Sequence, residues 1–356
     1  MALSVAVYHF SGWAHLSQSG TRANELVAIL GNYGVEGFFI VSGFCFFHLY
    51  GETQWDRRSL TDFHIKRFFR IAPLYYLAML LNFLLQQHLG LGFTWPSIAQ
   101  NLSFTFGLSY KVSGYFHPNH ALVVGGWSIG LEYAFYIFFP LLALLTRRKV
   151  MLYVLTAALI ALAWHWTFGA VQAASNMGDQ KFHTYVLLPN HAFLFLAGGI
   201  IAHLRSLTAR RLPLLLFLTG LALLILAALP RPFTFYDHFD AMAGTPRVKY
   251  VSLCFLIVTL FAFFDVPRNA LRKPLVLLGD ASYSVYLLHP FVHLALTKIA
   301  PVQARLVHWP PLANFALGLA LTLTLATVVY RFMEKPAIRL GRRVAGRFGK
   351  PLPVAT

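Results

Sequence analysis

Long apolar blocks, separated by short polar connections, constrain this chain more than any other feature of its sequence. A helix needs roughly 20 mostly apolar residues to cross the hydrocarbon core of a bilayer, and several blocks reach that length. Of the 356 residues, 58% are hydrophobic and only 12% are charged, whereas soluble domains carry about 25% charged residues. Too little polar surface remains to cover a soluble body of this size. We therefore predict an integral membrane protein.

The blocks predict an all-α bundle of about ten transmembrane spans that forms a single domain over residues 1–356. A further apolar stretch, 97–110, contains Asn101 and Gly107, and we interpret it as interfacial or re-entrant because a span there would invert every later connection. The expected spans are 1–16, 34–51, 71–89, 124–145, 150–168, 185–204, 212–229, 248–265, 280–299 and 311–333.

The basic residues gather in alternate connections, which indicates how the bundle is oriented. One set of connections and the tail hold 20 Lys and Arg residues, and the opposite set holds 8. Basic connections lie on the cytoplasmic side of a membrane, so both termini are expected there. The net charge of +17 is thereby assigned to membrane orientation and not to nucleic-acid binding. The basic side comprises 52–70, 146–149, 205–211, 266–273 and the tail at about 335–356, which we expect to contact anionic lipid headgroups.

The chain has two cysteines, Cys45 and Cys254, and both lie inside apolar blocks. Their spacing fits neither a metal site nor a disulfide framework, so we interpret them as small buried hydrophobic residues. The first apolar stretch has no basic residue before it, so we expect no cleavable signal peptide.

Ionisable side chains inside a membrane span are costly and are therefore candidates for function. His9 lies in the first block, where an imidazole could act as a general base; the alternative is a core histidine bonded to a neighbouring helix. Glu36 begins a block, and an interfacial position is the alternative for it. Gly37, Ser42 and Gly43 follow Glu36 and would allow close helix packing.

Glu132 is the candidate that is hardest to explain structurally, because it lies well inside its block with Tyr136 one turn away. A buried carboxylate needs a partner that replaces its lost hydration. The same block contains the pattern Gly-x-Ser-x-Gly at 126–130. A hydrolase nucleophile needs a strand–turn–helix setting for that pattern, and here the pattern begins a hydrophobic helix, so we reject it.

Arg67 and Arg70 share a face if their segment is helical, and guanidinium groups suit phosphate oxygens. A cytoplasmic nucleotide phosphate is one possible ligand, and plain orientation charge is the alternative. Glu334 lies at the inner end of the last block, where pairing with nearby arginines is the expected structural role.

Four polar side chains lie on one face of the block at 280–299. His289 and His293 are four residues apart, a spacing that can bind metal. No third ligand is adjacent and Pro290 lies between them, so we expect no metal and interpret the face as the lining of a cavity. The four residues are Ser282, Tyr286, His289 and His293.

Taken together, these runs resemble the integral-membrane acyltransferase family usually called acyltransferase family three, in its stand-alone form without a fused esterase-like domain. The matching segments occur in family order and span nearly the whole chain. They are 8–10, 34–44, 67–73, 127–136, 279–289 and 330–336.

The resemblance implies an enzyme that moves an acyl group, commonly acetyl, from acyl-coenzyme A to sugars of cell-surface polysaccharides and related molecules. His9 matches the essential first-helix histidine of the family. Arg67 and Arg70 match its inner-face Arg-x-x-Arg pair, and Glu132 matches the glutamate that follows its Trp-Ser pair. No bound cofactor is implied, because acetyl-coenzyme A is a co-substrate.

One departure from the family concerns the start of the chain. Family members carry an arginine eleven positions before the histidine, and that position would here precede Met1. Only eight residues precede His9. We interpret this as a misplaced or trimmed start; the alternative is an impaired member of the family.

Our sequence-based hypothesis is an O-acyltransferase of the bacterial inner membrane that modifies a carbohydrate or lipid-linked sugar. His9 takes the hydroxyl proton or transiently carries the acyl group, and Glu132 orients it, with Glu36 as a second candidate. Arg67 and Arg70 hold the donor phosphates. The cavity is expected to be lined by Trp127, Ser128, Tyr136, Ser282, Tyr286 and His289.

Two other classes of protein were weighed against this hypothesis. Intramembrane His and Glu side chains also suit a proton-coupled transporter or a flippase of a glycolipid or small solute. No inverted repeat or matched pair of broken helices stands out to support that class. A structural membrane scaffold would leave Glu132 unexplained.

Overall fold

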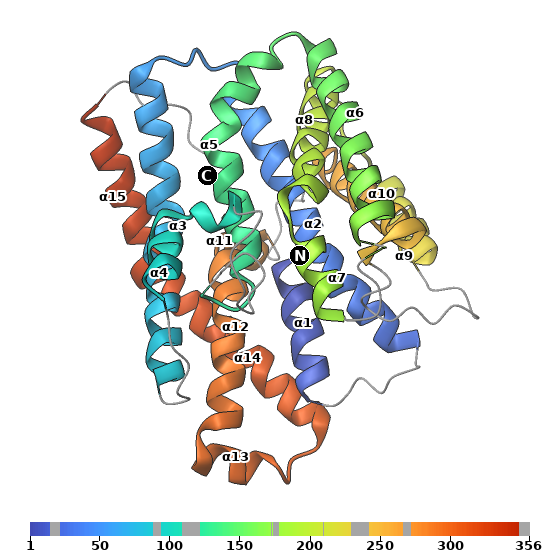
Figure 1. Cartoon of the computed structure of the whole chain (residues 1–356). Coiled ribbons are helices and arrows are strands. Elements are labelled where there is room, and N and C mark those ends of the chain that lie inside the picture. Colours follow the sequence, from blue (N-terminus) through green and yellow to red (C-terminus); the bar gives the residue numbers. More distant parts are fainter. Residues whose placement is uncertain are drawn as a thin grey trace.

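Every regular element that the computed structural model describes is a helix (Figure 1). The described residues are 1–14, 22–87, 94–108, 122–171, 173, 178–208, 210–228, 242–265 and 272–348. The elements are α1 Ala2–Trp13, α2 Arg22–Tyr50, α3 Arg57–Gln87, α4 Trp95–Ser103, η1 Thr105–Leu108, α5 Gly126–Leu145, α6 Lys149–Trp166, η3 Thr167–Val171, α7 Gly178–Tyr185, η4 Leu188–Asn190, α8 Ala192–Ser206, α9 Leu214–Ala228, α10 Gly244–Ala262, α11 Arg272–Asp280, α12 Ser282–Lys298, α13 Ala300–Leu306, α14 Pro311–Val329, η6 Tyr330–Glu334 and α15 Lys335–Gly346.

Each of the ten predicted segments overlaps a helix, namely α1, α2, α3, α5, α6, α8, α9, α10, α12 or α14. Within the described part of the chain, five helices are long and apolar enough to cross a membrane, or six if α11 and α12, bent by 67° at their junction, form one span. Helices such as α1, with 12 residues, fall short of the roughly 20 that a span needs. The chain is an integral membrane protein, and the count of ten spans stays a prediction.

The stretch at 97–110 does not form one continuous helix. Its described part contains α4 and the short 3-10 helix η1, and Phe104 between them has a left-handed backbone with φ 57°. Asn101 is fully buried and accepts a hydrogen bond from the Tyr75 hydroxyl of α3. Gly107 packs directly on the backbone of Gly130 in α5. A broken helix held against α3 and α5 fits the predicted interfacial or re-entrant form; residues 109–110 lie outside the described residues.

The connection before α3 shows how the chain starts its longest helix. The Ser59 backbone N–H donates to Asp56 Oδ1 over 2.7 Å, and the Asp56 N–H donates back to Ser59 Oγ over 2.8 Å. This reciprocal cap satisfies two donors that the first helical turn leaves open. The Ser59 N–H and the Ser59 hydroxyl, which donates to the same carboxylate oxygen over 2.8 Å, together lower the pKa of Asp56.

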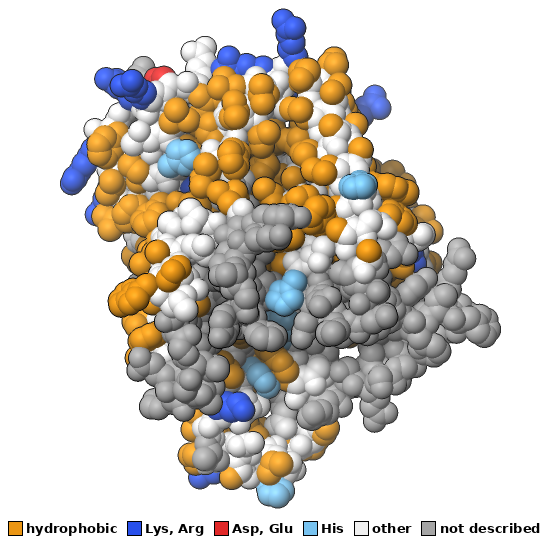
Figure 2. Space-filling view, viewed as in Figure 1, with side chains coloured by type: hydrophobic (Ala, Val, Ile, Leu, Met, Phe, Trp, Pro, Cys, Tyr) orange, Lys and Arg blue, Asp and Glu red, His pale blue; other side chains and the backbone are white. Residues whose placement is uncertain are grey.

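Connections that the charge pattern assigns to one side of the membrane touch each other. Lys149 Nζ lies 2.6 Å from Glu52 Oε1, and Arg211 Nε lies 2.7 Å from Asp265 Oδ2. Figure 2 shows Lys and Arg side chains gathered at the end of the molecule where these connections lie, with apolar side chains below them. That this end is cytoplasmic stays a prediction. Of the charges that we counted, four lie outside the described residues: Lys111, Arg231, Arg268 and Lys350.

α2 is the central helix of the bundle and packs on α1, α5, α8 and α10. The close packing predicted from its small residues is confirmed at Gly43, where a Cβ would collide with the Phe195 carbonyl of α8. Gly198 faces the α2 backbone in the same way, next to the carbonyl of Ile40. Small residues allow two backbones to come this close inside a membrane.

We expect Gly43→Val to lower the free energy of unfolding by about 1–3 kcal/mol or more, because the new side chain must push α8 away from α2. The melting temperature of the purified protein in detergent measures the effect. Gly279→Ala is the control, since nothing lies within 4 Å of a Cβ added there. Equal melting temperatures for Gly43→Val and the wild type would contradict the close packing.

Candidate functional site

Two histidines from opposite ends of the sequence meet inside the bundle. His9 lies on α1 and His289 on α12, and His9 Nδ1 is 2.7 Å from His289 Nε2. Their rings are nearly parallel, with an interplanar angle of 17° and centroids 5.0 Å apart. His289 is 2% exposed. The structure thus gives His9 a histidine as its hydrogen-bond partner.

Trp13 covers the histidine pair and was missed by the sequence reasoning. The centroid of its ring lies 5.1 Å from that of His9 and 6.0 Å from that of His289. Its ring also stacks on that of His293, with 3.8 Å between the centroids. Residues four apart on a helix lie on one face, so the spacing from His9 to Trp13 was a signal that could have predicted this contact. The stack fixes the plane of the His9 ring.

Tyr286 and Ser128 join this pair to the start of α5. Ser128 Oγ lies 2.8 Å from the Tyr286 hydroxyl, which donates to the Gly125 carbonyl over 2.9 Å. Gly125 has a φ of 76°, a left-handed conformation that glycine adopts without strain. Tyr286 precedes His289 by one helical turn, so α5 and α12 are tied together beside the histidines.

Glu132 is held by hydroxyl groups and not by His9. Its Oε1 accepts from Ser42 Oγ of α2 over 2.8 Å and from the Tyr136 hydroxyl one turn further along α5. The hydrogen-bond partner that the structure gives to His9 is His289. That Glu132 orients or charge-stabilises His9 stays a prediction.

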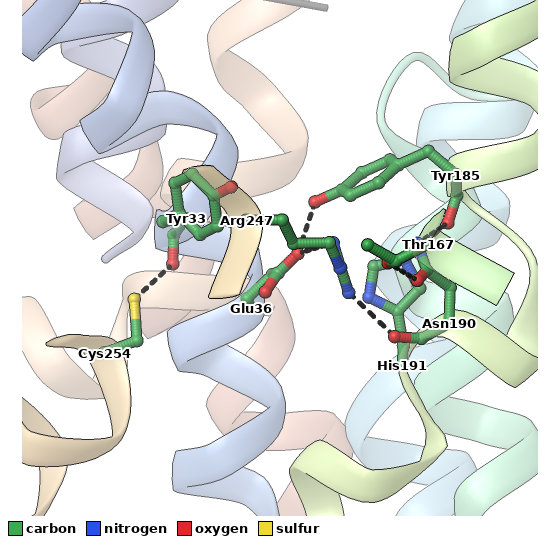
Figure 3. A network of polar contacts seen from close by, with 8 residues as sticks. All are labelled: Tyr33, Glu36, Thr167, Tyr185, Asn190, His191, Arg247 and Cys254. Atoms are coloured by element: carbon green, nitrogen blue, oxygen red, sulfur yellow. Dashed lines mark hydrogen bonds and ion pairs between the residues drawn. The ribbon is translucent and has the colours of Figure 1, made fainter. Parts of the chain in front are cut away.

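Glu36 forms a second, fully buried polar centre (Figure 3). Glu36 is 0% exposed and Arg247 of α10 is 3% exposed, and the two side chains form an ion pair. Tyr185 donates its hydroxyl to Glu36 Oε1 over 2.7 Å, and Arg247 Nη2 donates to the Asn190 carbonyl over 2.7 Å. Arg247 was counted as an orientation charge, which is wrong, because it compensates a carboxylate inside the protein.

His191 and Asn190 complete this centre and carried no signal in the sequence analysis. Asn190 donates to the Tyr185 carbonyl over 2.9 Å, and the His191 Nε2 lies 2.8 Å from the same oxygen. Cys254 Sγ lies 3.4 Å from the Tyr33 carbonyl, and both cysteines are free. Glu36 Oε2 and His191 Nδ1 have no hydrogen-bond partner among the described residues.

Trp127 lies between the two centres. It is 8% exposed, and the centroid of its ring lies 6.1 Å from that of Tyr185 and 5.5 Å from that of His191. Its neighbour Ser128 contacts Tyr286 on the side of the histidine pair. The start of α5 therefore contacts both polar centres, through Trp127 on one side and Ser128 on the other.

Arg67, in the first half of α3, is enclosed by aromatic rings. Its guanidinium lies 4.3 Å from the centre of the Phe46 ring and within 6 Å of the rings of Tyr50, Phe63 and Tyr136. Its Nη2 donates to the Tyr50 hydroxyl over 3.1 Å. Cation–π contacts of this kind stabilise a desolvated guanidinium.

Arg70 is paired with Glu334, which confirms the arginine pairing expected for that glutamate. Ser284 Oγ donates to the other carboxylate oxygen of Glu334 over 2.6 Å. The side chain of Arg70 is 28% exposed and that of Glu334 is 1% exposed. Ser282 begins α12 one helical turn before Tyr286 and is partly buried.

In the part of the chain that the structure describes, no three His, Cys, Asp or Glu side chains gather as a metal site. The histidine spacing that raised the metal hypothesis is explained by other contacts. His289 bonds to His9, and His293 stacks on Trp13.

Comparison with known families shows to which class of protein this helical chain belongs. The profile of a family described as an acyltransferase domain matches residues 1–331. The chain belongs to acyltransferase family three. It is therefore a membrane enzyme that transfers acyl groups, as the resemblance of the six segments predicted.

Two relatives show what kinds of proteins share this acyltransferase domain. The exopolysaccharide production protein ExoZ of Rhizobium meliloti is 32% identical over 325 residues, which cover 88% of this chain and 91% of that protein. The peptidoglycan O-acetyltransferase OatA of Listeria monocytogenes is 23% identical over 370 residues, which cover 91% of this chain and 56% of that protein. No solved structure matches the chain.

Proposed function

We propose that this acyltransferase is a single-domain O-acyltransferase of a bacterial inner membrane. Its proposed donor is acyl-coenzyme A, with acetyl as the acyl group, and its proposed acceptor is a hydroxyl of a cell-surface sugar or its lipid-linked precursor. The observation that carries the proposal is the His9–His289 pair inside an acyltransferase domain, in which His289 is buried and His9 is partly buried. The names of the two relatives, which refer to an exopolysaccharide and to peptidoglycan, support a carbohydrate acceptor.

In the proposed reaction His9 acts as the general base. Its ring takes the proton from the acceptor hydroxyl while the hydroxyl oxygen attacks the thioester carbonyl carbon. The new C–O bond forms, the C–S bond breaks, and the proton passes from His9 to the leaving thiolate of coenzyme A. A positioned base supplies about 10²- to 10⁴-fold in rate.

The donor is proposed to approach from the end of the bundle that carries Arg67 and Arg70. Arg70 is partly exposed, and each guanidinium has five N–H donors in a fork that matches phosphate oxygens. The buried carboxylate of Glu334 uses part of that capacity. Phosphates of the donor would then compete with Glu334 for Arg70.

The proposed function is tested with membranes from cells that express the protein and from matched cells that lack it. Acetyl-coenzyme A is supplied in two forms, one radiolabelled in the acetyl group and one in the adenine. We expect acetyl label, and no adenine label, in the polysaccharide and glycolipid fraction of the expressing membranes. Equal acetyl label in both membrane samples, with a native acceptor present, would contradict acyl transfer from this donor.

Two variants distinguish the proposed role of Arg70 in donor binding from its structural role in the ion pair with Glu334. Glu334→Gln removes the competing carboxylate, and Arg70→Gln/Glu334→Gln removes both charges without leaving one unpaired. We expect the double variant to raise the donor KM about tenfold over Glu334→Gln, because a charge-assisted hydrogen bond is worth roughly 1.5–3 kcal/mol. Initial rates against acetyl-coenzyme A concentration measure the KM.

The control for that comparison is Arg331→Gln, since Arg331 is an exposed arginine three positions before Glu334. Its donor KM should equal that of the wild type. If the double variant had the same donor KM as Glu334→Gln, Arg70 would not bind the donor.

A further inference from the structure

The proton on His289 is located by the backbone of α12. His289 Nδ1 lies 3.2 Å from the Val285 carbonyl oxygen, and its ring is also within hydrogen-bonding reach of the Tyr286 carbonyl. Pro290 has no N–H, so the carbonyl four residues before it, that of Tyr286, lacks its intrahelical donor. A carbonyl oxygen only accepts hydrogen bonds. The Nδ1 atom of His289 therefore carries the proton.

The proton on His9 follows from that on His289. A neutral imidazole carries one proton, so a His289 ring protonated on Nδ1 has a lone pair on Nε2. That Nε2 is the atom 2.7 Å from His9 Nδ1. The contact is a hydrogen bond only if His9 Nδ1 donates, which leaves the lone pair of His9 on its Nε2 atom.

We propose that His289 is a positioning residue that holds His9 in the tautomer with its proton on Nδ1 and its basic lone pair on Nε2. The proposal rests on the proposed acyl transfer and names the atom of His9 that takes the hydroxyl proton. In serine hydrolases a carboxylate fixes the histidine tautomer in this way. Here a neutral imidazole, anchored by helix carbonyls, fills the same position.

The hydrogen bond to His289 also matters during the reaction. When His9 Nε2 takes the proton from the acceptor hydroxyl, the His9 ring becomes a cation with N–H groups on both nitrogens. Its Nδ1–H still donates to His289 Nε2, and that bond strengthens because its donor is now charged. The proton on Nε2 then leaves with the thiolate, and the Nδ1 proton never moves.

The first arm of the test compares His289→Leu with His289→Gln by initial-rate kinetics at equal protein levels. The glutamine side chain places a carbonyl oxygen near the position of His289 Nε2 and can accept from His9 Nδ1–H, whereas leucine cannot. We expect His289→Leu to lower kcat about 10²-fold with the donor KM within about threefold. His289→Gln should restore kcat to within about tenfold of the wild type.

Equal losses of kcat in His289→Leu and His289→Gln, with both proteins folded, would overturn the proposal. So would a His289→Leu variant as active as the wild type. His48→Leu is the matched control for loss of a histidine, because His48 is exposed at the far end of α2.

The second arm reads the tautomer without any need for turnover. Nitrogen-15 NMR of histidine-labelled protein in lipid shows whether each ring nitrogen is protonated, and the His9 signals are assigned by their loss in His9→Gln. We expect a protonated Nδ1 and an unprotonated Nε2 on His9, and loss of this preference in His289→Leu. The reverse tautomer in the wild type would overturn the proposal, whatever the outcome of the acyl-transfer assay.

Discussion

Replacing His9 by alanine should lower acyl transfer by about 10²- to 10⁴-fold, because no other base is then placed to take the acceptor proton. The measurement is the transfer of radiolabel from acetyl-coenzyme A to the polysaccharide and glycolipid fraction of membranes. His289 remains in place in the variant, but it is buried and its Nδ1 is committed to the helix backbone. It should therefore not take over the role of His9.

Two further variants make the result specific. His48→Ala removes an exposed histidine from α2 and should retain the full rate. Glu132→Gln keeps an acceptor for Ser42 and Tyr136 while it removes the negative charge, so its rate measures the electrostatic contribution of that residue. Equal label from wild-type and His9→Ala membranes would exclude His9 as the base.

Breaking the Glu36–Arg247 pair should give the largest loss of stability in the chain. Substituting one partner leaves the other charge buried without compensation, which costs about 3–5 kcal/mol. We expect Glu36→Gln and Arg247→Met each to lower the melting temperature in detergent strongly. The double variant should lose less stability than the two single losses added together, since it leaves no unpaired charge.

The exposed pair Lys149–Glu52 provides the comparison for this double-mutant cycle. Its side chains are 37% and 80% exposed, and surface ion pairs contribute about 0–1 kcal/mol. The coupling energy between Lys149→Met and Glu52→Gln should therefore be small. A coupling between Glu36 and Arg247 no larger than that between Lys149 and Glu52 would contradict a stabilising role for the buried pair.

The helices that overlap the ten predicted segments were predictable from the sequence because each depends on one continuous block of apolar residues. All ten predicted segments overlap helices, and the stretch at 97–110 was interpreted differently because a span there would invert every later connection. The candidates His9, Glu36 and Glu132 were found by the same local argument, since an ionisable residue within an apolar block needs a reason to be there.

The partners of those residues were not predictable, because they come from helices that are distant in the sequence. His9 and His289 are 280 residues apart, and Glu36 and Arg247 are 211 residues apart. Which helices become neighbours depends on how their side chains pack together, and the sequence of a single segment does not show its packing partners. Glu132 was expected to orient His9, but the structure gives Glu132 the hydroxyls of Ser42 and Tyr136 as hydrogen-bond partners.

The same long separations have a consequence for biosynthesis. His9, Glu36 and Arg70 are synthesised early, while His289, Arg247 and Glu334 are synthesised later. At about 5–20 residues per second, each early side chain remains without its partner for roughly 10 to 60 seconds. During that interval the nascent chain exposes polar groups to lipid and is a substrate for membrane proteases and insertion chaperones. Chains that stop before α10 should therefore be degraded quickly, because none of the three pairs has formed.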